Sequence, residues 1–161
     1  MWFWNQEKEM DAELPTDYEI LCGIEEEFLI VHKDGTLAEV ADEIMKNAAQ
    51  ILEKNPKFLD KIKLMIRGLD AEPSPTQIEY VTLPLPLDQT KEAIDLGRKL
   101  VIDAARQEGC KIFTQSMHPI QSNPNPIAGT HLNISAQHKG SLMVPTDMKA
   151  IYNYLWNMLP E

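Results

Sequence analysis

The chain has no long hydrophobic segment and only two cysteines. No apolar run approaches the ~18 residues of a membrane-spanning helix, so we expect no membrane span. The first residues lack the basic and apolar regions of a signal peptide, and we therefore expect a cytoplasmic protein. Cys22 and Cys110 form no metal-binding spacing such as CxxC, and each lies in an apolar segment. We expect both to be free thiols that pack as small hydrophobic side chains.

Positive charge is also scarce, with 15 lysines and arginines against 25 aspartates and glutamates and a net charge of −10. Nucleic acids and anionic membranes would be repelled by this excess, so neither is an expected partner. ATP is not excluded, because bound metal or local cations can neutralise its phosphates. The sequence nevertheless contains no glycine-rich P-loop.

The hydrophobic pattern predicts strands that alternate with helices along the chain. The predicted strands are 18–31, 62–66, 76–83, 110–115 and 129–136, and the predicted helices are 37–53, 88–108 and 146–156. Asn55-Pro56 is predicted to end the first helix, and Asp88 to cap the second. This order indicates an α+β fold in which helices cover one face of a mostly antiparallel sheet. The other face would then be available for a ligand.

The length of 161 residues suits one domain. We expect residues 18–161 to form it and residues 1–17 to be a separate N-terminal segment. That segment begins with the aromatic residues Trp2, Phe3 and Trp4. We expect it to dock on the domain or on another subunit.

Two glutamates share one face of the first predicted strand. Side chains alternate along a strand, so Glu25 and Glu27 point the same way, and the opposite face is apolar except for Glu26. Carboxylates ~7 Å apart repel each other unless a cation lies between them. Magnesium prefers such oxygen ligands, so the pair suggests a metal site. A solvated outer face is the alternative.

Two further strands repeat this pattern. Gln77 and Glu79 share one face of the strand 76–83, while His131 and Asn133 share one face of the strand 129–136. A single histidine is more often structural than a ligand. Three strands that each present polar groups beside an apolar reverse face, however, indicate a functional site.

Four segments, in their order and spacing, resemble the carboxylate–amine ligases of glutamate–cysteine ligase family two. The string Gly23-Ile24-Glu25-Glu26-Glu27 resembles the GxExE strand that opens the family's domain, and Gln77-Ile78-Glu79 resembles its second acidic strand.

The other two segments depart from the family pattern. His118-Pro119 resembles the family's Thr-His-Pro turn, with Met117 in place of threonine. Residues 129–135 (GTHLNIS) are similar to its His-x-His-x-Gly strand, with Asn133 in place of the second histidine.

The resemblance implies a glutamine synthetase-like half-funnel of antiparallel strands that binds ATP, magnesium or manganese, and glutamate. In such ligases ATP phosphorylates the γ-carboxylate of glutamate, and an amine, usually cysteine, then displaces the phosphate. By resemblance Glu25, Glu27 and Glu79 would bind the metal, and His131 would contact a metal or a phosphate. Asn133 and Gln77 would bind substrate.

Members of the family are considerably longer than this chain, and the resemblance covers their N-terminal half. The other half would supply cations that face the triphosphate. Near the motifs, Arg67 and Lys111 are the nearest basic residues. We therefore expect a homo-oligomer, in which another copy lends Arg67, Arg98 or Arg106, or a partner that supplies the missing half. A non-catalytic metal- or nucleotide-binding subunit, or an adaptor, is the alternative to a ligase.

Overall fold

The computed structural model describes residues 18–72, 74–120 and 127–138. One compact unit comprises Leu21–Ile134, and a second combines residues 1–20 with 135–161. The core and the site described below lie within Leu21–Ile134. The predicted segment 1–17 and the predicted helix 146–156 lie outside the described residues.

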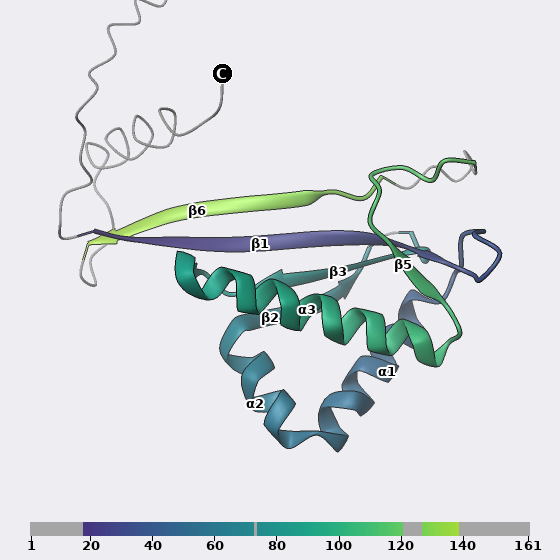
Figure 1. Ribbon diagram of the computed structural model, residues 1–161, viewed down its shortest axis with the longest axis horizontal. Coiled ribbons are helices and arrows are strands. Elements are labelled where there is room, and N and C mark those ends of the chain that lie inside the picture. Colours follow the sequence, from purple (N-terminus) through teal and green to yellow (C-terminus); the bar gives the residue numbers. More distant parts are fainter. Residues whose placement is uncertain (1–17, 73, 121–126, 139–161) are drawn as a thin grey trace, which may run out of the picture. The chain divides into compact units, whose positions relative to one another are not determined.

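The described part of the chain contains six strands and three helices (Figure 1). In chain order they are β1 (Tyr18–Val31), α1 (Ala41–Lys54), α2 (Pro56–Met65), β2 (Ile66–Ala71), β3 (Gln77–Thr82), β4 (Leu85–Pro86), α3 (Leu87–Gln107), β5 (Lys111–Phe113) and β6 (Thr130–His138). The strands form one sheet in the order β2-β3-β1-β4, and β5 and β6 also pair with β1. The pairs of β3, β4 and β5 with β1, and of β2 with β3, are antiparallel.

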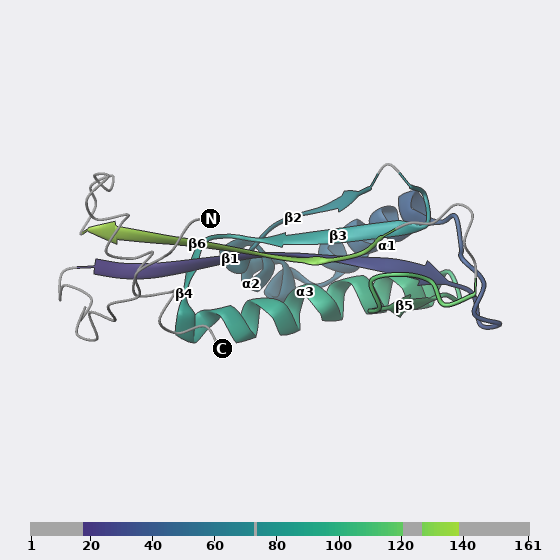
Figure 2. The same ribbon diagram turned by 90° about the horizontal axis from the view of Figure 1, so that it is seen from above.

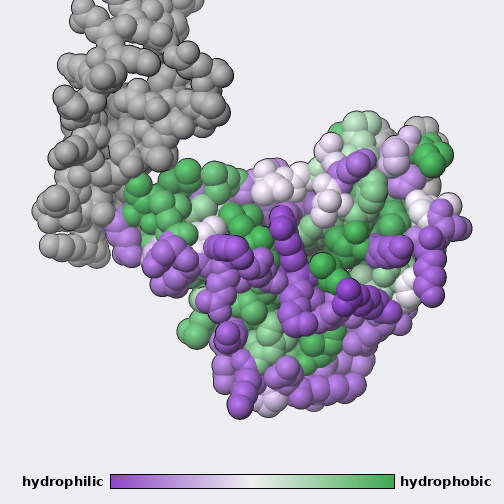
Figure 3. Space-filling model, in the orientation of Figure 1, coloured by the Kyte–Doolittle hydropathy of each residue, from purple (hydrophilic) through white to green (hydrophobic). Residues whose placement is uncertain are grey.

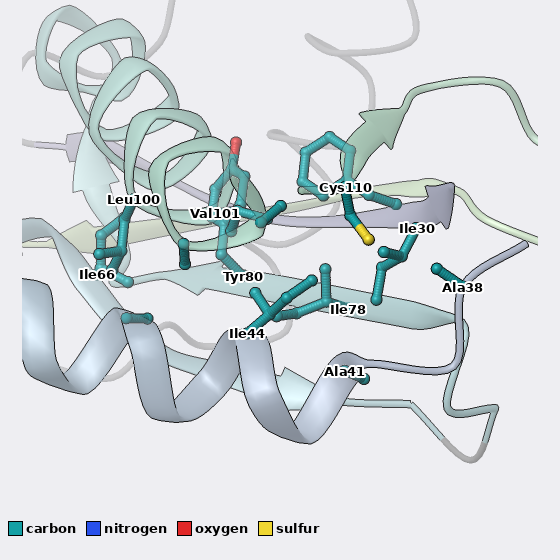
Figure 4. Packing of buried hydrophobic residues seen from close by; sticks show 14 of the residues in the cluster. Ile30, Ala38, Ala41, Ile44, Ile66, Ile78, Tyr80, Leu100, Val101 and Cys110 are labelled. Atoms are coloured by element: carbon teal, nitrogen blue, oxygen red, sulfur yellow. The ribbon is translucent and has the colours of Figure 1, made fainter. Parts of the chain in front are cut away.

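The predicted α+β architecture is confirmed, because the three helices gather on one side of the sheet (Figures 1 and 2). The main core lies between these layers. Phe28 and Ile30 of β1 and Ile78 and Tyr80 of β3 meet Ile44 of α1 there (Figure 4). All five are at most 2% exposed. Polar side chains cover much of the outward surface of the helices (Figure 3).

The predicted strand 62–66 is wrong over most of its length, because residues 62–65 belong to α2. Asn55-Pro56 does end α1, but it also begins α2. The Asn55 side chain accepts a hydrogen bond from the Phe58 N–H at 3.2 Å, and Pro56 occupies the first turn, where its missing N–H costs nothing. Phe58 and Ile62, one helical turn apart, pack against the core.

Two predicted helix starts also shift. Residues 37–40 precede α1, and Leu37 instead pairs with Val31 in an isolated bridge and packs in a small second cluster. The helix α3 begins at Leu87 with Pro86 as its cap residue, so Asp88 lies in the first turn and is not the cap. An acidic residue in the first turn still stabilises the helix, because its negative charge lies near the positive end of the helix dipole.

The expectation of two free, buried thiols is confirmed. Cys22 and Cys110 are free and buried. No helix in the described part of the chain has both the length and the apolar character that crossing a membrane requires.

Candidate functional site

The pairing of β1 with β3 places the predicted acidic residues next to one another. In the antiparallel register Glu27 lies directly opposite Glu79, and Glu25 lies opposite Val81. Residues directly opposite in a sheet share a face, with Cβ atoms about 5 Å apart. The intervening residues Phe28 and Tyr80 point into the core, so the glutamates occupy the face away from the helices.

The strand β6 brings its polar residues to the same face. The two carboxylate oxygens of Glu25 meet His131 Nδ1 at 3.1 Å and the donating Nδ2 of Asn133 at 3.3 Å. Glu27 Oε2 accepts a hydrogen bond from the Gly129 N–H at 2.9 Å, and the Glu27 N–H donates to the Gly129 carbonyl, also at 2.9 Å. The three predicted motif strands therefore converge through direct contacts.

The strand β2 adds carboxylates that the sequence reasoning missed. Asp70 lies opposite Glu79 in the register, and Glu72, directly after β2, is close enough to Glu79 to act on its carboxyl. Asp70 and Glu72 alternate along the chain just as Glu25 and Glu27 do. This alternation was the available signal, but it was obscured by the wrong strand assignment at 62–66. We call Glu25, Glu27, Asp70, Glu72 and Glu79 the acidic face.

The crowding of carboxylates perturbs proton affinity on this face. Burial, the hydrogen bond and charge of Glu72, and the charges of Glu25 and Glu27 together raise the pKa of Glu79 to about 7. The hydrogen bond that His131 makes to the Glu25 carboxylate, aided by the nearby charges of Glu27 and Glu79, raises the pKa of His131. The acidic face therefore favours any bound positive charge, whether a proton or a cation.

A small cavity of about 180 Å³ adjoins Glu27. Thr130 of β6 and the preceding Gly129 line it on one side, and Thr114 and Ser116 line it from the segment after β5. The two hydroxyl-bearing residues 114 and 116 carry no recognisable motif in the sequence and were missed. They supply neutral hydrogen-bonding groups beside the carboxylates.

Two other predicted residues make contacts with the backbone. Gln77 is 6% exposed, and its Nε2 donates to the Ile127 carbonyl at 2.8 Å, which ties β3 to the segment before Gly129. Its role in substrate binding stays a prediction. His118 of the predicted turn has its Nε2 2.6 Å from the Gly35 carbonyl, and its ring lies beside Phe113.

Arg98, predicted as a cation that another copy could lend, lies on the helix side of the sheet. Its Nε and Nη2 donate to the two carboxylate oxygens of Glu26 at 2.8 and 2.6 Å, and Tyr80 Oη donates to Glu26 at 2.7 Å. Burial acts to raise the pKa of Glu26, but these hydrogen bonds and the Arg98 charge outweigh it and lower that pKa. Arg98 thus neutralises the one charged residue on the apolar face of β1.

The donor set of the acidic face fits a hard divalent cation, since carboxylate oxygens with an imidazole are ligands for magnesium and manganese. Among the described residues no lysine or arginine forms an ion pair with Glu25, Glu27 or Glu79. In the geometry of that same part of the chain, no group of three or more acidic, histidine or cysteine side chains is arranged to hold a metal ion. The metal site at Glu25, Glu27, Glu79 and His131 stays a prediction.

Comparison with known proteins agrees with this arrangement. The glutamate-cysteine ligase family 2 matches residues 21–143, which include all three motif strands. The chain belongs to this family. The resemblance seen in the motifs is thereby confirmed, and with it a relationship to carboxylate–amine ligases.

Solved structures support the fold. Two structures of GmaS, a glutamine synthetase-like ligase, resemble the chain: an ADP complex at 15% identity with a TM-score of 0.51, and an apo form at 18% identity with a TM-score of 0.53. Each similarity covers 78% of this chain but only 31% and 32% of the GmaS chains. The glutamine synthetase-like fold is thus confirmed, and the chain spans about a third of those relatives. None of the curated proteins matches it.

Proposed function

We propose that the chain supplies the acidic part of the active site of an ATP-dependent carboxylate–amine ligase that forms a γ-glutamyl amide bond. The convergence of Glu25, Glu27, Glu79 and His131 from three strands onto one sheet face carries this proposal. Family membership favours glutamate as the acid and cysteine or another amine as the acceptor.

The proposed cofactors are ATP and magnesium or manganese. The acidic face would hold the metal through Glu25, Glu27 and Glu79, with His131 as a further ligand or a contact to phosphate. Bound metal would neutralise the charge of the ATP phosphates. The structure of GmaS with ADP supports nucleotide binding by a chain of this fold.

The substrate contacts are proposed at Asn133 and Gln77. The amide of Asn133 is held beside Glu25 on the exposed part of β6. There it is able to donate to a carboxylate of glutamate once a metal occupies Glu25. Gln77, which is buried and shares the sheet face of Glu79, would bind substrate from the other end of that face.

We propose that this face needs completion by another subunit or by further residues of a longer protein. The described acidic face has no lysine or arginine paired with its motif glutamates, whereas phosphoryl transfer depends on positive groups around the phosphates. Loss of one such donor typically costs about 10²–10³ in rate. The chain alone is expected to turn over little or not at all.

The test combines binding with product analysis. The purified chain is titrated with ATP with and without magnesium, and then incubated with ATP, magnesium, glutamate and cysteine while γ-glutamylcysteine is followed by mass spectrometry. We expect magnesium-dependent ATP binding and very little product. Absence of ATP binding with magnesium would overturn the proposal.

The same assay separates the alternatives. Abundant product that is lost in Glu27→Gln would show that the chain is a complete enzyme and needs no partner. ATP binding without product, even when the C-terminal part of a family member is added, would assign the chain to the non-catalytic nucleotide-binding class.

A further inference from the structure

A second cavity lies away from the acidic face, at the end of α3. It has a volume of about 470 Å³ and is lined by Lys33, Ile102, Arg106, Gly109, Cys110, Lys111 and Ile112. This volume lies within the range of small-molecule sites. The lining contains three basic residues, several apolar ones and no acidic residue. This positive charge contrasts with the net charge of −10 of the whole chain.

Three separate segments bring the positive charges together. Lys33 belongs to the turn after β1, Arg106 to the last turn of α3, and Lys111 to the start of β5. Gly109, with a φ of +68°, adopts the left-handed conformation that ends α3 and reverses the chain into β5. The tertiary fold thus gathers cations that the sequence keeps apart.

Partners within the described chain do not account for these charges. Among the described residues neither Lys33 nor Lys111 forms an ion pair. Arg106 pairs with Asp103 at 3.2 Å, a partly exposed carboxylate that also pairs with Lys99. The nearby Glu108 accepts a hydrogen bond from Asn47 at 2.6 Å. The dipole of α3 stabilises a cation at the C-terminal end of the helix. This accounts for the position of Arg106 but not for those of Lys33 and Lys111, which lie outside the helix.

The cavity wall is suited to binding a ligand, because its one thiol, that of Cys110, is not placed to react with it. Cys110 is 3% exposed, and its sulfur lies among the core side chains (Figure 4). Burial and the charge of Glu108 raise the pKa of this thiol, so it is a poor nucleophile. Ile102 and Ile112 offer an apolar surface beside the three cations.

We propose that this cavity binds a small organic anion that carries closely spaced negative charges, as phosphate esters and polycarboxylates do. The guanidinium of Arg106 presents paired donors to such groups, while the two lysines act as mobile point charges. The site is distinct from the acidic face and requires neither metal nor ATP.

The experiment is calorimetric titration of the chain with pyrophosphate and, separately, with citrate, in magnesium-free buffer at fixed ionic strength. Wild type is compared with Lys33→Gln/Lys111→Gln and with the control Lys61→Gln/Lys91→Gln. The control removes the same charge from exposed lysines on α2 and α3 that pair with Glu92 and Asp95. Amide resonances of Gly109 and Ile112 report the location of binding.

We expect saturable binding that the cavity variant weakens by at least about tenfold, the typical effect of losing a charged hydrogen-bond partner, and that the control retains within about twofold. Binding of pyrophosphate alone would identify a phosphorylated ligand, and binding of citrate alone a polycarboxylate. No saturable binding of either anion, or an equal loss in both variants, would overturn the proposal.

Discussion

Glu27 of β1 and Glu79 of β3 lie directly opposite each other in the antiparallel register, with no cationic side chain of the described residues paired to either. Like charges directly opposite in a sheet destabilise it. The arrangement therefore costs folding free energy that a bound cation would recover. This relationship determines the first two predictions.

Replacing both Glu25 and Glu27 with glutamine is expected to abolish magnesium and manganese binding, because two of the proposed ligands lose their charge. The same change should raise the free energy of unfolding of the metal-free protein, since carboxylate repulsion is removed while an acceptor oxygen remains for Gly129. Calorimetry and urea unfolding measure the two effects. Glu39→Gln/Glu43→Gln, which removes two exposed charges elsewhere, is the control. Unchanged metal affinity in the first variant would remove Glu25 and Glu27 from the site.

The stability of the metal-free protein is expected to fall as pH rises from about 4.5 to 7. The pKa of Glu79 rises from 4.5 to about 7 on folding. Between these values the folded state keeps a proton that the unfolded state has released, so the free energy of unfolding falls progressively as pH rises to about 7. His131, whose pKa is also raised, acts in the same direction, because its contribution is lost as pH rises through its folded-state pKa. Urea unfolding at several pH values tests this. Glu79→Gln should flatten the lower part of the profile, and an unchanged profile would contradict the assignment.

Arg98→Met is expected to destabilise the fold by about 1–3 kcal/mol, because it leaves the buried Glu26 carboxylate without its bidentate partner. The matched control is Lys91→Met on the same helix, which breaks an exposed ion pair with Asp95 and should cost less than about 1 kcal/mol. Thermal or urea unfolding measures both. Adding Glu26→Gln to Arg98→Met should recover part of the loss. Equal costs for the two single variants would show that burial of Glu26 is energetically unimportant.

Self-association is proposed through β6. Leu132 and Ile134 of β6 are 60% and 38% exposed. Exposed hydrophobic surface on a strand that pairs with β1 in the described sheet invites contact with another chain. We expect oligomers by sedimentation analysis that dissociate in Leu132→Glu. Leu64→Glu, at a residue 70% exposed on α2, should leave them intact. A monomeric wild type at high concentration would refute this.

Local pattern determined the type of most elements and the grouping of the motif residues. Alternation along β1, β3 and β6 put Glu25, Glu79 and His131 each on a polar face, because the side-chain period of a strand is two and one face must be buried. It failed at residues 62–65, where a short apolar run fits both periods, and a capping Asn-Pro pair decided for a helix.

Only the tertiary structure decided which residues meet across elements. The register of β2 against β3 joined Asp70 to the acidic face and brought Glu72, just after β2, close to Glu79. Packing of α3 gave Glu26 its partner Arg98. The fold also gathered Lys33, Arg106 and Lys111 around one cavity. Such contacts depend on strand order and helix packing. Strand order and helix packing are set by burial of the whole core and not by any local segment. For this reason the spacing of residues along the chain does not reveal which side chains meet.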